Sequence, residues 1–222
     1  MKNPGKTVRV FLMCCLLLWK ALASTESAES GESVASVGSA AFSPRFASQG
    51  DLTLLDLRGF QQTTDFSCGP AALVTLLDYY SILGKEIDIA SDVGTVQGSG
   101  THPVAMTNWL NANGFEAAWG EAPTGAAGLL MLRNHLKAGI PTLVEWIDWG
   151  GDWVVVVGYD TKGTENPSDD DIIFADPYDH TDGKADGLTF VNAEKFLSMW
   201  FDANCFERHM KRVYVIARPR NR

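Results

Sequence analysis

The feature that most constrains the fold of this chain is a change of hydrophobic pattern at Pro141. Before this residue, apolar residues recur at the three- and four-residue spacing of amphipathic helices. After it, they form short runs separated by glycine-rich or polar turns, which is the pattern of strands joined by hairpins. Helices first and antiparallel strands second predict an α+β fold.

The helical half opens with the clearest helix signal in the sequence. Gly69-Pro70 begins a helix, because proline suits the first helical turn, and Gly84 ends it. Further helices are predicted over residues 87–93, 101–114, 125–139 and 193–202. The predicted core positions are Leu73, Leu76, Leu77, Tyr80, Met106, Trp109, Leu110, Leu129, Leu132 and Leu136.

The second half is predicted to hold strands over residues 142–149, 153–159, 172–175 and 213–217. The first two are separated by Gly150-Gly151-Asp152, and paired glycines at such a point predict a hairpin turn. Trp146, Trp149 and Trp153 lie on or beside this hairpin. They suit either an extended groove for a peptide or ordinary packing in the core, and both interpretations stay open.

The first 50 residues divide into two segments with their own composition. Residues 1–23 combine a basic stretch, ten apolar residues and small residues before a cleavage point, which is the layout of a signal peptide. Residues 24–50 are rich in Ser, Ala, Glu and Gly without any period, and predict a flexible tether. We therefore expect a secreted or periplasmic protein with its folded domain over residues 51–222. No stable membrane span is expected after cleavage, because ten apolar residues are too few to cross a bilayer.

The charge of the chain argues against a nucleic-acid partner. The sequence has 18 Lys and Arg against 27 Asp and Glu, for a net charge of −9. Residues 1–23 hold four of the cations and no anion, so the remainder carries 14 − 27 = −13. A body this acidic repels phosphate backbones, and we expect it to bind no nucleic acid.

The strongest signal for chemistry is Cys68, which starts the first predicted helix six residues after Gln62. The positive end of a helix dipole favours a thiolate, so we expect an accessible thiol that is more reactive than Cys205. The Cys68 backbone amide and the Gln62 side-chain amide are donors that suit the oxyanion formed by attack on a carbonyl. The other interpretation makes Cys68 a small buried apolar residue.

Residues 62–80, 152–160 and 175–177 together resemble the papain-like cysteine peptidases that cut bacteriocin leaders after a double glycine, the peptidase C-39-like domains, and their exported stand-alone relatives. The resemblance implies a papain-like fold with the active site in a cleft between the helical half and the sheet half. It implies that Cys68 is the nucleophile and that Gln62 is the oxyanion residue. It also implies that Asp176 orients the catalytic base and that the substrate is a peptide or protein.

The chain departs from this family at the position of the catalytic histidine, where it has Asp152. An aspartate places negative charge beside the sulfur and raises the pKa of the cysteine, instead of supporting a thiolate. Two interpretations remain open. Either another base arrives, for which His102 and His180 are the candidates, or the fold has lost peptidase activity and keeps a cleft that binds peptide.

Three hypotheses of function follow, and whether the chain is an enzyme stays open. The first is an exported cysteine peptidase or amidase that acts on peptide bonds through Cys68 and is impaired by Asp152. The alternative is a catalytically inactive pseudopeptidase module that binds peptide. The third is an exported domain stapled by a disulfide between Cys68 and Cys205, without chemistry in a cleft. The oligomeric state does not follow from the sequence.

Acidic residues recur at Asp176, Asp179, Asp182 and Asp186, a composition that suits calcium. The spacing does not fit a calcium loop, because a loop that starts at Asp182 has Lys184 where an oxygen ligand belongs. The spacing favours a solvated acidic loop, so we expect neither a metal nor another cofactor.

Overall fold

The computed structural model describes residues 51–179, 187–202 and 205–220. The predicted signal peptide and tether lie outside these ranges, as do His180, Asp182 and Asp186. Among the helices of the described ranges, none has the length and apolar character that crossing a bilayer requires.

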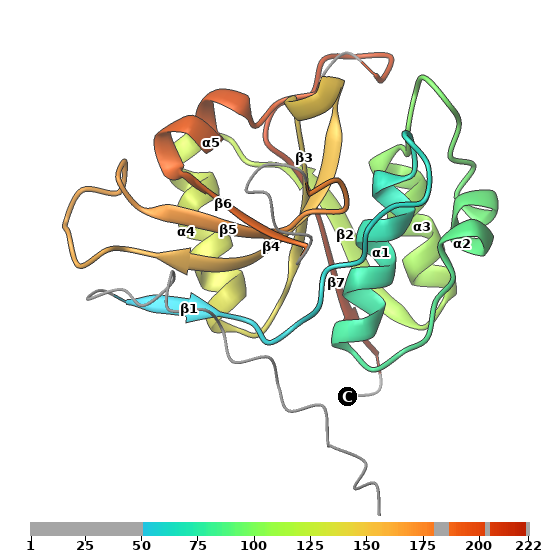
Figure 1. Ribbon diagram of the computed structural model, residues 1–222, viewed down its shortest axis with the longest axis horizontal. Helices are drawn as coiled ribbons and strands as arrows, with labels where there is room; N and C mark the ends of the chain where they lie inside the picture. The colour runs from blue at the N-terminus through green and yellow to red at the C-terminus, as the bar shows by residue number, and fades with distance from the viewer. Residues whose placement is uncertain (1–50, 180–186, 203–204, 221–222) are drawn as a thin grey trace, which may run out of the picture. The chain divides into compact units, whose positions relative to one another are not determined.

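Three successive helices follow the first strand, and most of the strands come later in the described chain (Figure 1). The helices are α1 (Cys68–Tyr79), α2 (Glu86–Asp92), α3 (Pro103–Ala112), α4 (Gly125–Lys137) and α5 (Ala193–Met199). The strands are β1 (Leu52–Leu54), β2 (Phe115–Glu121), β3 (Thr142–Trp146), β4 (Asp152–Asp160), β5 (Asp171–Ala175), β6 (Leu188–Asn192) and β7 (Val213–Pro219). A short 3₁₀ helix, Asp148–Gly150, joins β3 to β4.

The strands form one antiparallel sheet in the order β2-β7-β3-β4-β5-β6, with β1 paired to the end of β4. β3 and β4 make the predicted hairpin, whose register sets Trp146 opposite Asp152. β1 pairs farther along the same strand, with Leu54 opposite Gly158. β4 therefore lies in the middle of the sheet, and its first residue lies at the hairpin turn.

Helices cover both faces of this sheet (Figure 1). Successive side chains of a strand point to opposite faces, so β4 contributes to two cores. Trp153 and Val155 pack in the core that includes α1 and α3, while Val154 and Val156 pack in the core that includes α4 and α5. Because both faces are covered, β4 is buried along its whole length, and its residues 153–157 are one continuous apolar run.

The α+β fold and the hairpin are confirmed, and each predicted helix is present, although α1 ends at Tyr79 and not at Gly84. The predicted core positions are buried, except that Tyr80 and Trp109 are only partly so. Three strands were not predicted: β1, β2 and β6. Each is short or mixes buried and exposed residues irregularly, so none shows the clear alternation that marks a strand in a sequence.

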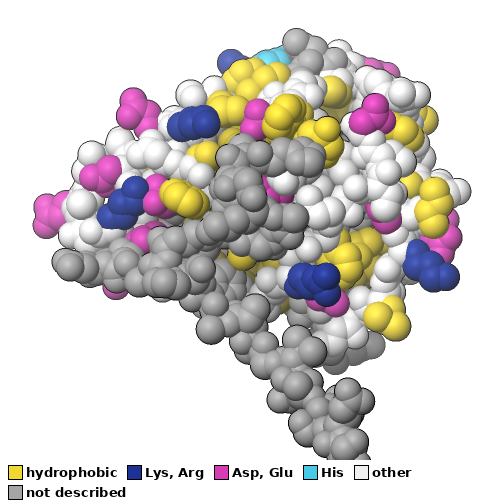
Figure 2. All heavy atoms as spheres, in the orientation of Figure 1, with side chains coloured by type: hydrophobic (Ala, Val, Ile, Leu, Met, Phe, Trp, Pro, Cys, Tyr) yellow, Lys and Arg dark blue, Asp and Glu magenta, His cyan; other side chains and the backbone are white. Residues whose placement is uncertain are grey.

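Charged side chains of both signs lie on the described part of the face in view. Figure 2 shows acidic side chains spread over this face and interspersed with Lys and Arg. This distribution agrees with the acidic net charge of the sequence.

Candidate active site

Cys68 is the first residue of α1, and the loop before it is held by Glu86 of the next helix. Ser67, which precedes the helix, contacts Glu86 Oε1 through its hydroxyl at 2.5 Å, and the Thr63 amide donates to the same oxygen at 3.0 Å. Gly69 lies against Thr101, since a Cβ at Gly69 would come within 2.6 Å of Thr101 Oγ1. The loop from α2 to α3 therefore packs directly onto the start of α1.

The hairpin brings Asp152 to the sulfur of Cys68. The thiol donates a hydrogen bond to the Asp152 carboxylate, and the backbone amides of Gly69 and Trp153 also bond the sulfur. Cys68 is 7% exposed and Asp152 is 3% exposed. The structure thus sets a carboxyl group beside the cysteine, at the position where the resemblance implies an imidazole.

The pKa of Cys68 is raised strongly, chiefly by burial and next by the negative charge of Asp152. The two backbone amides act in the opposite direction and are outweighed. The sequence-based expectation of an accessible thiol with a lowered pKa is therefore wrong. A helix N-terminus favours a thiolate only while the sulfur keeps enough solvation, and here burial removes it.

The pKa of Asp152 is also raised well above its usual range. Burial is the main cause, and the charges of Asp176 and Asp148 add to it. A hydrogen bond from the Cys68 thiol and the nearby Trp146 side chain oppose the shift without reversing it. The site therefore resists negative charge on both the carboxyl and the thiol.

Gln62 lies beside these residues, and its side-chain amide is already hydrogen-bonded. Its Nε2 donates to Thr64 O at 2.7 Å, and its backbone amide donates to Pro177 O at 2.9 Å. Its Oε1 is buried without a hydrogen-bond donor among the described residues. An oxyanion would have to compete with Thr64 O for the Nε2 hydrogens.

Asp176 is 2% exposed and lies at the end of β5. Its Oδ1 accepts a hydrogen bond of 2.7 Å from the Tyr178 backbone amide, and its charge acts on Asp152. Gln61 holds the turn that follows β5: its Nε2 donates to Asp176 O at 2.8 Å, and its Oε1 accepts from Asp179 N at 3.3 Å. Asp176 thus lies near enough for its charge to act on residue 152, which is an aspartate where the resemblance implies a histidine.

A cavity of about 280 Å³ joins the residues from the two halves of the fold. It is lined by Gln62, Asp65, Cys68, Trp149, Gly151, Asp152 and Tyr178. The predicted residues Gln62, Cys68 and Asp152 are thus brought together, while Asp176 is not among the lining residues. Asp65 and Tyr178 were not predicted as lining residues, although each lies within three residues of a predicted site residue. Trp149 is the one of the three hairpin tryptophans that takes the groove position left open by the sequence.

The histidines of the described chain all lie away from this cavity. His102 caps α3, where its Nδ1 accepts from the Val104 amide at 3.2 Å and its ring contacts Phe206. His135 lies 3.0 Å from Thr142 Oγ1, and His209 packs against a phenylalanine. The structure therefore does not bring the candidate base His102 to Cys68, and the other candidate, His180, lies outside the described residues.

The cysteines, the hairpin tryptophans and the acidic residues each had more than one interpretation in the sequence. Cys68 and Cys205 are both free, so the disulfide hypothesis is wrong. Trp146 and Trp153 are each 2% exposed and belong to the core, which leaves only Trp149, at 59% exposed, to face a groove. No group of His, Cys, Asp or Glu in the described ranges is arranged to hold a metal ion.

Comparison with known proteins supports the family that the sequence resembles. The model of the Peptidase_C39 like family matches residues 54–205. Among curated proteins, no significant match is found.

Two solved structures share the fold. The peptidase domain of Streptococcus ComA, a bi-functional ABC transporter involved in quorum sensing, has a TM-score of 0.53 and 19% identity, over 73% of this chain and 98% of that one. A double-glycine-motif protease from an AMS/PCAT transporter, solved with its leader peptide, has a TM-score of 0.50 and 16% identity, over 75% of this chain and 94% of that one. The chain therefore belongs to the Peptidase_C39 like family and has the fold of a papain-like cysteine peptidase domain.

Proposed function

We propose that this domain binds peptide in the cavity over Cys68 and has lost efficient peptidase activity. The observation that carries the proposal is the carboxyl of Asp152, hydrogen-bonded to the thiol at the position where the family resemblance implies a histidine. This is the pseudopeptidase alternative, and the geometry supports it better than an active peptidase.

The chemistry of amide hydrolysis explains why Asp152 is a poor substitute. A histidine takes the thiol proton, holds a positive charge beside the thiolate, and later returns the proton to the leaving amine. A carboxylate that takes the same proton becomes neutral, so it offers no charge to balance the thiolate. The buried carboxylate also raises the pKa of Cys68 while it is ionised. The proton therefore stays on sulfur, and the nucleophile is not formed.

Three features support peptide as the ligand. The cavity lies where the helical and sheet halves meet, which is where the family resemblance implies the substrate cleft. The related AMS/PCAT protease is solved in complex with a leader peptide. Trp149 and Tyr178 also present aromatic surface in the cavity, which suits contact with an extended chain.

A second candidate function is a peptidase that uses His180 as its base. Tyr178 lines the cavity, and His180 follows it by only two residues. An imidazole supplied from this segment would restore the missing general base.

We further propose that the protein is secreted or periplasmic, on the strength of the signal-peptide layout of residues 1–23. N-terminal sequencing of exported material is expected to begin at Ser24. A product that stays in the cytoplasm and still begins at Met1 would overturn this part of the proposal.

One experiment tests binding and catalysis together. Wild-type protein is titrated with a blocked peptide that contains a double glycine, and is separately assayed for burst-phase acylation by an activated ester. We expect saturable peptide binding without a burst that depends on Cys68. Cys68→Ala is the matched control, because it should keep the binding. A burst that disappears in both Cys68→Ala and His180→Ala would overturn the proposal and establish His180 as the base.

A further inference from the structure

The cavity over Cys68 has an acidic lining, which an uncharged peptide backbone would not require. Among the described residues that line it, the carboxylic acids are Asp65 and Asp152, the other titratable groups are the Cys68 thiol and the Tyr178 hydroxyl, and none is Lys or Arg. Asp148 and Asp176 lie close enough to add their charges at Asp152. Negative charge on these acids is costly without a counter-charge nearby, so a cationic occupant stabilises it.

The aromatic side of the cavity favours the same occupant. Trp149 and Tyr178 meet edge to face, with ring centroids 5.3 Å apart and an interplanar angle of 79°. Trp149 remains 59% exposed, although large aromatic residues usually bury their surface. An exposed indole face beside carboxylates is the arrangement that attracts an ammonium or guanidinium group.

The backbone of this loop is arranged to present Trp149 and not to bury it. Trp149 has φ 54° and ψ 19°, in the left-handed region that an aromatic residue rarely adopts. The Trp149 amide donates to Asp148 Oδ1 at 3.2 Å, and the Cys205 thiol bonds Gly150 O at 3.6 Å. Strain held in place by neighbouring contacts is typical of functional loops.

Two oxygen atoms of the lining residues have no hydrogen-bond donor among the described residues. Asp152 Oδ2 and Gln62 Oε1 are both buried without a hydrogen-bond donor in the described part of the chain. Both residues line the cavity. An occupant that carries several N–H groups meets this need, as lysine and arginine side chains do.

From these four observations we infer that the cavity over Cys68 selects peptides by a cationic side chain, that of lysine or arginine, held between Asp65, Asp152 and the face of Trp149. This inference rests on the proposed peptide-binding function and adds the class of peptide. The volume of about 280 Å³ lies just below the usual range for small-molecule sites, which suits one side chain.

The test compares blocked nonapeptides of Gly and Ala that differ only in the central residue: Lys, Arg, norleucine, citrulline or Glu. Norleucine and citrulline remove the charge of lysine and arginine while keeping most of their shape. We expect Kd to be about tenfold lower for the Lys or Arg peptide than for its uncharged counterpart, and the difference to shrink as salt is raised. The Lys and Arg arms show which cation is preferred.

Variants locate the site of this preference. Asp65→Asn and Trp149→Leu should each reduce the preference for the cation about threefold. Asp56→Asn is the matched control, since it removes one exposed charge outside the cavity and should leave the preference unchanged. Asp65 and Trp149 are both exposed, so neither substitution removes a core side chain. The comparison between peptides on wild-type protein does not depend on any variant.

The outcomes separate the two proposals. Equal binding of the lysine and norleucine peptides leaves peptide binding in place and overturns the preference for a cation. A preference that survives in both Asp65→Asn and Trp149→Leu also overturns it, because the cation would then bind elsewhere. Failure of every peptide to bind overturns the proposed function together with this inference.

Discussion

Asp152 and Asp170 are both buried aspartates, and they lie near opposite ends of β4. Asp152 is the first residue of the strand and is 3% exposed, while Asp170 is 2% exposed and contacts Tyr159 near the last residue. Asp170 accepts a 2.5 Å hydrogen bond from the Tyr159 hydroxyl. Asp152 instead faces a thiol and the charge of a second carboxyl group, Asp176. Similar burial of the same residue type therefore produces two different sites.

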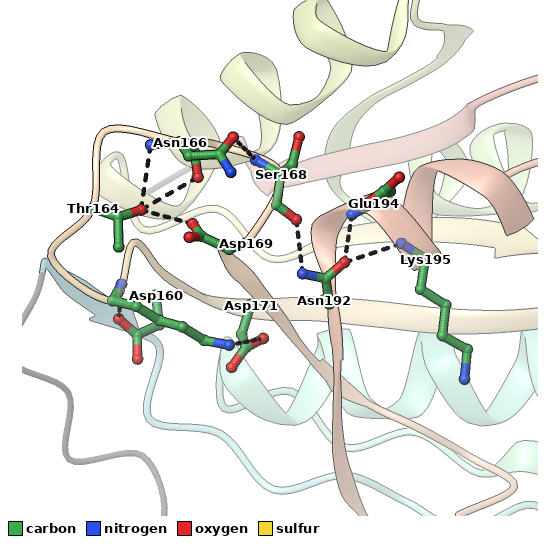
Figure 3. Close-up of polar contacts among 10 residues, drawn as sticks. Asp160, Thr164, Asn166, Ser168, Asp169, Asp171, Asn192, Glu194 and Lys195 are labelled. Atoms are coloured by element: carbon green, nitrogen blue, oxygen red, sulfur yellow. Dashed lines mark hydrogen bonds and ion pairs between the residues drawn. The ribbon is translucent and has the colours of Figure 1, made fainter.

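The Asp170 end is closed by polar groups that match one another. In the loop between β4 and β5, Thr164 Oγ1 donates to Asp169 Oδ1 at 2.7 Å, and Asn192 Nδ2 donates to Ser168 O at 2.7 Å (Figure 3). The Asp170 backbone carbonyl accepts the amide that begins α5, at 2.7 Å. Each acceptor here has a donor, as in the structural parts of most proteins.

The Asp152 end has the opposite balance. Acidic groups meet there around a buried thiol, and Asp152 Oδ2 has no donor among the described residues. Buried groups in this condition cost stability, and they are retained mainly where a ligand or a reaction uses them. The presence or absence of hydrogen-bond donors, and not burial alone, therefore distinguishes Asp152 in the site from Asp170 in the scaffold.

The largest expected effect is at the Asp152 end. Asp152→His should place an imidazole against Cys68, with Asp176 positioned to hold its other nitrogen. General-base assistance is worth about 10² to 10⁴ in rate, so burst-phase acylation by an activated ester should rise by a factor in that range. The pKa of Cys68, followed by alkylation rate against pH, should fall, because a positive charge replaces a negative one.

Asp152→Asn is the control for this gain, since it removes the charge of the carboxylate without adding a base. It should lower the pKa of Cys68 and leave acylation slow. If Asp152→His folds normally but neither lowers the pKa nor accelerates acylation, the missing imidazole is not what limits the site.

The second effect is at the Asp170 end, and it concerns stability. Asp170→Ala should lower the free energy of unfolding by about 2 to 3 kcal/mol, because it leaves the buried Tyr159 hydroxyl without its acceptor. Urea denaturation measures the loss, and Glu165→Ala in the exposed part of the loop is the control. Peptide binding should not change. A loss of less than about 0.5 kcal/mol would show that water replaces the carboxylate and that the two ends differ less than proposed.

The third prediction compares the two thiols. At pH 8, iodoacetamide should modify Cys205 about ten times faster than Cys68, because both pKa values are raised but Cys68 is more deeply buried and faces Asp152. Mass spectrometry of peptides after timed quenching measures each rate. Faster modification of Cys68 would mean that its helix N-terminus outweighs burial, and would favour an active nucleophile.

The predicted and the unpredicted parts of the site differ in how far apart their residues lie in the chain. Gln62 and Cys68 share one short segment, so their spacing was enough to identify them. The pKa of Cys68 was predicted with the wrong sign, since its position at a helix start is visible in the sequence and its burial under another loop is not. Trp149 and Tyr178 meet only because separate loops are held together in the fold.

The strands show the same limit of prediction from sequence: only those marked by a local pattern were predicted. β3 and β4 were predicted because two apolar runs flank a glycine turn, a local signal. β2 and β6 are formed by pairing with β7 and β5, which are distant in the chain or carry no matching pattern. Their residues adopt extended structure because an edge of the sheet is there to pair with, and context of this kind overrides weak local preference.

The smallest expected effect distinguishes the two aspartates by pH. The folded-state pKa of Asp152 lies above the unfolded value of about 3.9, so its contribution to stability is present below that pH and is lost as pH rises through the folded pKa. Asp152→Asn removes this loss, and should raise the free energy of unfolding by about 1 kcal/mol at pH 7, with the gain vanishing below about pH 4. Asp170→Asn should instead destabilise the protein at pH 7. Urea unfolding at a series of pH values measures both. A loss of stability in Asp152→Asn at pH 7 would show that the favourable contacts of Asp152 with Cys68 and Trp146 outweigh the repulsion from Asp176, and the contrast between the two ends of β4 would disappear.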